Sequence, residues 1–118
     1  MKNHTTSGWM PIAAYRDFYD VPRAFLVVPQ PGLILFFDCP FDDSIDDYPG
    51  SYQVFAIEGL QLAELPADWR RLCHLSKGSL GEVPIASLKF DSTRRKEVLV
   101  DHLERLIEGA DRLPSVRV

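Results

Sequence analysis

The sequence predicts an α+β fold: a small, mostly antiparallel sheet or partly open barrel of about four or five strands, with a C-terminal amphipathic helix packed on it. Two runs rich in β-branched and aromatic residues, Ala24–Val28 and Leu33–Phe37, predict the centre of the sheet. Apolar side chains that recur every three or four residues near the C-terminus predict the helix. Packing the apolar stripe of such a helix onto one face of a sheet buries both surfaces.

The two runs are predicted to form an antiparallel hairpin. Pro31 and Gly32 between them suit the central positions of a type II turn, because proline presets φ and glycine accepts a positive φ. Both runs are apolar at every position. Strands of this kind are covered on both faces, so we expect a helix, a second sheet layer or a partner chain on each side of the hairpin.

Other elements follow from local patterns. We expect a first strand between Trp9 and Tyr19, loops at 38–50 and 76–81, and strands at 51–57 and 82–90. A short helix is expected over residues 65–75, with Trp69, Leu72 and Cys73 facing inward. Pro84 lies in the last strand, and because proline cannot donate a ladder hydrogen bond, we expect it at a sheet edge or in a bulge.

The terminal helix is expected to run from an N-cap at Asp91 to about Glu108, with Gly109 as its stop. The basic run 94–96 would then lie in its first turn, where the helix dipole disfavours cations. This run suits pairing with acidic residues or binding of a phosphorylated ligand, but a solvated basic turn is the simpler interpretation. The predicted buried stripe consists of Leu99, Val100, Leu103, Leu106, Ile107 and Ala110.

The expected organisation is a polar tail over residues 1–8 followed by a single α+β domain over residues 9–118. The longest purely apolar runs have five residues, whereas a membrane-spanning helix needs about 20. The N-terminus lacks the apolar segment of a signal peptide, and two cysteines are too few for a disulfide framework. We therefore expect a cytoplasmic protein without membrane contacts, in which Cys39 and Cys73 are not disulfide-bonded and perform no chemistry.

The net charge of −4 is concentrated in the first half of the chain. Between Arg23 and Arg70 there is no Lys or Arg, while eight acidic residues occur there. Nucleic acids and anionic membrane surfaces are recognised by clustered Lys and Arg side chains. We therefore expect no nucleic-acid partner.

Half of those eight acids lie in one short segment that also contains two aromatic residues. Like charges held in one loop create a field that steers an oppositely charged partner, and aromatic side chains are favoured as interface anchors. We predict that this segment is the surface through which the domain contacts a basic protein. The predicted partner-binding residues are Phe41, Asp42, Asp43, Asp46, Asp47 and Tyr48.

Two other interpretations of the segment stay open. In the simpler interpretation, the segment is a solvated connection between two elements. In the other, the segment binds a divalent cation, because carboxylates are hard oxygen ligands. An EF-hand frame that begins at Asp42 fails, since Asp47 stands where the sharp turn needs glycine and Gln53 where the bidentate glutamate belongs. A looser cation site is compatible with the sequence.

No motif indicates catalysis or a cofactor. The chain has no Cys-x-x-Cys, His-Glu-x-x-His or glycine-rich phosphate-binding motif, and Ser79 lacks the glycine two residues before it that a nucleophile elbow requires. We therefore expect a non-enzymatic accessory protein that binds another protein and needs no cofactor. The alternative is a small enzyme or ligand-binding protein with a pocket between sheet and helix, formed by Asp or Arg side chains distant in sequence. A homo-oligomer is compatible with both hypotheses.

Overall fold

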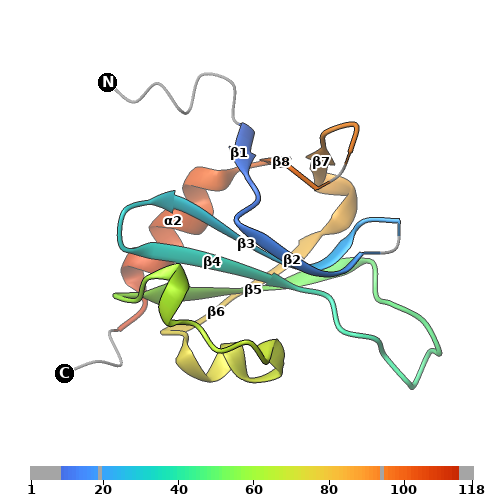
Figure 1. Cartoon of the computed structure of the whole chain (residues 1–118), viewed down its shortest axis with the longest axis horizontal. Helices are drawn as coiled ribbons and strands as arrows, with labels where there is room; N and C mark the ends of the chain where they lie inside the picture. The colour runs from blue at the N-terminus through green and yellow to red at the C-terminus, as the bar shows by residue number, and fades with distance from the viewer. Residues whose placement is uncertain (1–8, 19, 94, 115–118) are drawn as a thin grey trace.

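The computed structural model describes residues 9–18, 20–93 and 95–114, so the predicted polar tail 1–8 lies outside the described residues. The described part is an α+β domain with two antiparallel sheets and one α-helix (Figure 1), as the sequence predicts. No helix in this part is long and apolar enough to cross a membrane.

The larger sheet is a five-stranded meander whose strands are neighbours in chain order. Its strands are β2 (Ala14–Phe18), β3 (Pro22–Gln30), β4 (Leu33–Asp38), β5 (Ser51–Glu58) and β6 (Gly78–Pro84). The smaller sheet has the order β1-β8-β7 and pairs the first strand of the described chain with the last. Its strands are β1 (Trp9–Pro11), β7 (Leu88–Phe90) and β8 (Glu97–Val100). The helix is α2 (Leu103–Arg112), and three 3-10 helices are η1 (Leu62–Glu64), η2 (Trp69–Leu75) and η3 (Ile85–Ser87).

The predicted hairpin is confirmed. Strands β3 and β4 are antiparallel, and Gln30 pairs with Leu33, which leaves Pro31 and Gly32 as the whole turn. Gly32 has a φ of 84°, the value that the second central position of a type II turn requires. The register shifts once, between Val27 and Gln30.

The first face of the five-stranded sheet is closed. Phe25 and Phe37 stack with their ring centroids 4.7 Å apart, and the Tyr52 ring meets both edge to face. The buried Tyr52 hydroxyl donates a hydrogen bond to the Pro22 carbonyl oxygen, 2.7 Å away. The smaller sheet and α2 cover this face with buried apolar side chains, namely Met10, Leu88, Val98, Val100, Leu106 and Ala110.

The second face is covered by the segment 60–75, which contains η1 and η2. Leu72 of η2 is fully buried against Leu26, Ile34 and Phe36 of the hairpin. Leu60, Leu65 and Trp69 pack around this cluster. Both faces of the hairpin are therefore covered, as its two apolar faces predict.

The predicted start of the terminal helix is wrong. Residues 97–100 form β8, which pairs with both β1 and β7, and α2 begins only at Leu103. Val98 and Val100 are buried while Glu97 is exposed, so the spacing here has the period of two that a strand requires. Asp91 is therefore not a helix N-cap.

The rest of the terminal prediction holds in part. Leu106 and Ala110 are buried on α2, and Leu103 packs half-buried against the same core, but Gly109 lies inside the helix and does not end it. Residues 95 and 96 lie in the connection between β7 and β8, and residue 94 is outside the described residues, so the basic run does not open a helix.

Three further predictions need correction. The stretch 9–19 holds two strands that belong to different sheets, and Gly78–Pro84 is a strand where a loop is expected at 76–81. The strand expected at 82–90 is interrupted by η3. Pro84 does end β6 at a sheet edge, because its nitrogen cannot extend the ladder. The helix expected at 65–75 is the shorter η2, in which Leu72 is buried and Trp69 and Cys73 are half-buried.

Candidate functional site: an acidic arm beside a groove

The predicted partner-binding residues lie on residues 39–50, which we call the acidic arm. The arm connects β4 to β5 and projects from the sheet (Figure 1). Asp42 and Asp47 form an isolated antiparallel bridge, in which each backbone N–H donates to the other residue's carbonyl oxygen at 2.9 and 3.3 Å. Asp46 adopts a φ of 54°, which aspartate tolerates better than most residues. The arm is thus an ordered miniature hairpin.

Asp42 stabilises the turn of this hairpin. Its carboxylate accepts hydrogen bonds from the Ser44 backbone N–H at 3.0 Å and from the Ser44 hydroxyl at 2.6 Å. These hydrogen bonds hold the pKa of Asp42 below its usual range, because they favour the ionised form. The ionised form of Asp42 therefore stabilises the turn.

Arg23 holds the base of the arm. Its guanidinium carbon lies 4.4 Å from the centre of the Tyr48 ring, and its Nη2 pairs with the Asp20 carboxylate at 2.5 Å. The buried Cys39 thiol donates to the Pro49 carbonyl oxygen at 3.2 Å, which joins the two ends of the arm. Tyr48 is thus engaged in holding the arm rather than exposed as an anchor.

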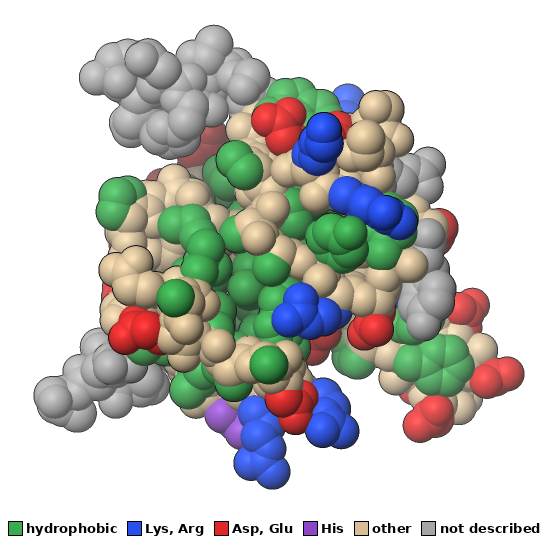
Figure 2. All heavy atoms as spheres, viewed as in Figure 1, with side chains coloured by type: hydrophobic (Ala, Val, Ile, Leu, Met, Phe, Trp, Pro, Cys, Tyr) green, Lys and Arg blue, Asp and Glu red, His purple; other side chains and the backbone are tan. Residues whose placement is uncertain are grey.

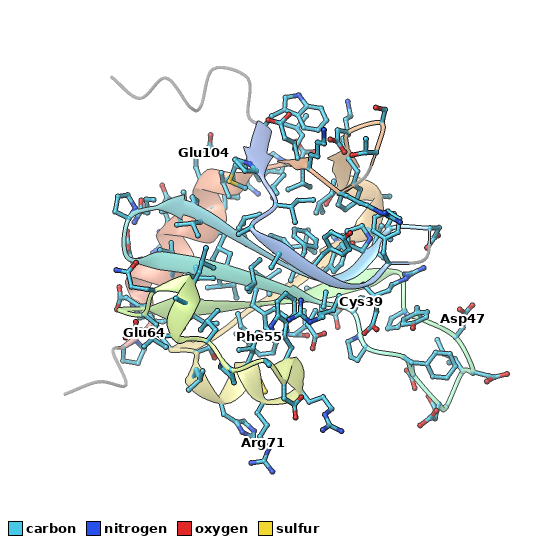
Figure 3. The ribbon with its side chains drawn as sticks, viewed as in Figure 1. Cys39, Asp47, Phe55, Glu64, Arg71 and Glu104 are labelled. Atoms are coloured by element: carbon cyan, nitrogen blue, oxygen red, sulfur yellow. The ribbon has the colours of Figure 1, made fainter. Side chains whose placement is uncertain are left out.

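The outer part of the arm exposes charge and apolar surface together. Asp43, Asp46 and Asp47 are exposed, and the side chains of Phe41 and Ile45 are 48% and 57% exposed. Figure 2 shows the acidic side chains gathered around hydrophobic groups at this projecting end, and Figure 3 places Asp47 on the arm and Cys39 at its base. Ile45 is missing from the predicted site, although it is the one apolar residue between the two aspartate pairs.

A row of mostly polar residues crosses the second face of the sheet beside the arm. The register of the five strands aligns Arg16, Ala24, Asp38, Gln53 and Glu82, one from each strand. The neighbouring row is more apolar, consists of Ala14, Leu26, Phe36, Phe55 and Ser79, and is covered around Phe36 by Trp69. We call the first of these the polar row.

Two hollows meet along the polar row. The first has a volume of about 660 Å³ and is lined by the sheet, by Phe41 and Tyr48 of the arm, and by Trp69 of η2. The second has a volume of about 350 Å³ and continues past Gln53 to Glu82. Asp38 and Pro40 line both. We call the two hollows together the groove.

Asp38 stands at the centre of the groove with no partner. Its carboxylate makes no hydrogen bond or ion pair with any residue that the structure describes. Partial burial raises the pKa of Asp38 to about 6, and the negative charge of Asp17 contributes in the same direction. Asp17 is itself held at a φ of 55°, a conformation that costs energy for a residue with a side chain.

The cysteines and the possible cation site need separate description. Both cysteines are free; burial raises the pKa of the Cys39 thiol, which disfavours its reactive thiolate form. Within the described ranges, no three His, Cys, Asp or Glu side chains converge as metal ligands. The enzyme hypothesis expects a pocket between sheet and helix, and the first hollow is lined by the sheet, the arm and the 3-10 helix η2.

Comparison with known proteins returns nothing for this chain: no family model, curated protein or solved structure matches it. Function therefore has to be argued from the site itself.

Proposed function

We propose that this protein is a binding module that contacts a basic protein through the acidic arm. The observation that carries the proposal is the ordered presentation of four aspartates and two exposed apolar side chains on one projecting hairpin. A protein interface commonly combines apolar anchors with charges that steer the partner. The arm provides both within a few residues.

Folding alone gives no reason for an arm of this composition. Strands β3 and β4 are joined by two residues, whereas β4 and β5 are joined by residues 39–50. Mutual repulsion between carboxylates in one loop costs stability, and Phe41 and Ile45 bury little surface in the free protein. A partner that supplies cations and covers the two apolar side chains offsets both costs.

The partner can be captured by photo-crosslinking. Replacing Phe41 with benzoylphenylalanine places a reactive group on the arm, and we expect the crosslinked protein to be basic. The decisive measurement is the association rate of that purified partner. Replacing Asp42, Asp43, Asp46 and Asp47 with Asn should slow association at least about tenfold at low salt, and raising salt should slow the wild type.

A matched variant separates steering by the arm from net charge. Replacing the exposed Glu97 and Glu104 with Gln, and Asp101 and Asp111 with Asn, changes the net charge equally but on β8, α2 and the turn between them. We expect this control to alter the association rate less than about threefold. Equal rates for the two variants, or a crosslinked partner that is acidic, would contradict the proposed function.

A further inference from the structure

We propose that the groove binds an arginine side chain of the basic partner, with the guanidinium group on the Asp38 carboxylate. The proposal rests on the proposed function and names the anchor that the partner supplies. It is carried by the charges in the groove, by the aromatic side chains that line it, and by its position beside the arm.

The half-buried Asp38 carboxylate stays unmatched among the charges of the groove. Two of the arginines that line the groove already have partners, since Arg70 pairs with Asp68 at 2.9 Å and Arg23 pairs with Asp20. Asp38 is half-buried and has no such partner among the described residues. A carboxylate that loses part of its hydration without a counter-charge is unfavourable, so a cation that enters the groove and pairs with Asp38 is favoured.

The aromatic side chains already bind guanidinium groups. Arg16 lies over the Trp69 ring at 4.1 Å from its centroid, and Arg23 lies over Tyr48. Phe41 lines the same hollow, its edge-to-face contact with Tyr48 leaves it 48% exposed, and none of the described Lys or Arg side chains lies over its ring. A guanidinium group from outside can therefore contact Phe41 and Asp38 in one hollow.

Arginine fits this site better than lysine. Asp17 lines the same hollow as Asp38, and its negative charge contributes to the raised pKa of Asp38. A guanidinium group has five donors in a planar fork and can bridge two carboxylates while stacking on an aromatic ring, whereas an ammonium group is a compact point charge. The groove also continues past Gln53, which gives room for the residues next to the arginine.

The test uses three small probes that differ only in the side chain: the N-acetyl methylamides of arginine, lysine and citrulline. Each is titrated into the ¹⁵N-labelled protein at pH 7.5 and 0.15 M salt, and amide shifts are followed by NMR. We expect the arginine probe to move the signals of Asp38 and Phe41 with millimolar affinity, the lysine probe to bind at least about threefold more weakly, and the neutral citrulline probe not to bind.

Two groove variants, compared with the arm variant, distinguish the groove from the arm. Asp38→Asn keeps the size of the side chain and should weaken the arginine probe at least about tenfold, while the quadruple Asn variant of the arm should change it less than about threefold, because the probe needs no steering. Asp17→Asn, at an exposed position, is the second variant and should weaken the probe about threefold. Spectra of the variants without probe report whether the fold is kept.

Four outcomes would overturn the arginine site. They are equal binding of citrulline and arginine, unchanged binding to Asp38→Asn, movement of the same signals by Ca²⁺ or Mg²⁺ alone, and a wild-type dimer in sedimentation that Asp38→Asn makes monomeric. None of these alters the association rates measured for the arm. Conversely, equal association rates for the arm variant and its matched charge control would overturn the proposed function. That result would not affect the arginine titration.

Discussion

The two faces of the five-stranded sheet are formed by the same strands but are covered to different extents. The first face is closed by a second sheet and α2, and its aromatic residues contact one another in a continuous cluster. The second face is closed around Phe36 and Leu72 and left open at the polar row. The closed face contributes most of the buried apolar surface and hence most of the stability. The open end leaves a half-buried carboxylate without a partner, which costs stability but makes it available to a ligand.

The largest expected effect contrasts one phenylalanine from each face. Phe37→Ala on the closed face removes a fully buried ring and should lower the free energy of unfolding by about 3–5 kcal/mol. Phe55→Ala on the second face removes a half-buried ring and should cost about 1–2 kcal/mol. Urea unfolding followed by circular dichroism measures both. Equal losses would show that the open end contributes as much to stability as the closed face does.

A buried lysine fastens α2 to the sheet. The side chain of Lys77 is only 6% exposed; its Nζ donates to the Ala110 carbonyl oxygen at 2.8 Å and pairs with Glu58 at 3.2 Å. Lys77→Met should lower the free energy of unfolding by about 1–3 kcal/mol, because the Ala110 carbonyl oxygen loses one of its two donors and Glu58 loses its ion-pair partner. The matched change at exposed Lys89 should stay within about 0.5 kcal/mol in the same unfolding experiment. A loss of the same size at Lys89 would contradict this account of the closed face.

The difference between the faces also explains what the sequence predicts. The hairpin is predictable because its turn residues and apolar runs are adjacent in the chain. The terminal helix is predicted to start too early because Leu99 and Val100 fit a helical stripe as well as a strand, and Trp9, the β1 partner of Leu99, is distant in sequence.

The acidic arm stands out in the sequence as a candidate site because its charges are contiguous, whereas the groove gives no such signal. The polar row depends on the register of five strands, and an isolated acid such as Asp38 or a single arginine such as Arg16 gives no local signal. Tyr48 is predicted as an anchor for the partner, and its contact with Arg23 is not predictable because it requires two segments of the chain to meet. Sequence patterns report local order, and this groove is formed by non-local pairing.

The unpaired Asp38 carboxylate predicts a dependence of stability on pH at the open end. Its pKa is about 6 in the folded protein, against about 3.9 for an unfolded chain. Between these values the folded state binds the proton more tightly, so the free energy of unfolding should fall as pH rises from about 4 to about 6 and stay lower above. Because the carboxylate is partly solvated, we expect a fall of about 1–2 kcal/mol rather than the full shift.

Chemical unfolding across this pH range, compared with Asp38→Asn, measures that contribution. The Asn variant should lack the fall, and Asp17→Asn should show a smaller one, because the charge of Asp17 adds to the shift. Identical pH profiles for wild type and Asp38→Asn would mean that Asp38 is well solvated and that the open end carries no such cost.

The smallest expected effect concerns the arm, where function and stability should separate most clearly. Replacing Asp42, Asp43, Asp46 and Asp47 with Asn should change the free energy of unfolding by less than about 0.5 kcal/mol, since the last three are exposed and asparagine also tolerates the positive φ of Asp46. At low salt the variant should be slightly the more stable, because repulsion between the carboxylates is removed, and the difference should vanish at high salt. Urea unfolding at the two salt concentrations measures both values. A loss of several kcal/mol would mean that the aspartates hold the fold together, and slower association of the same variant with a partner could then no longer be attributed to steering.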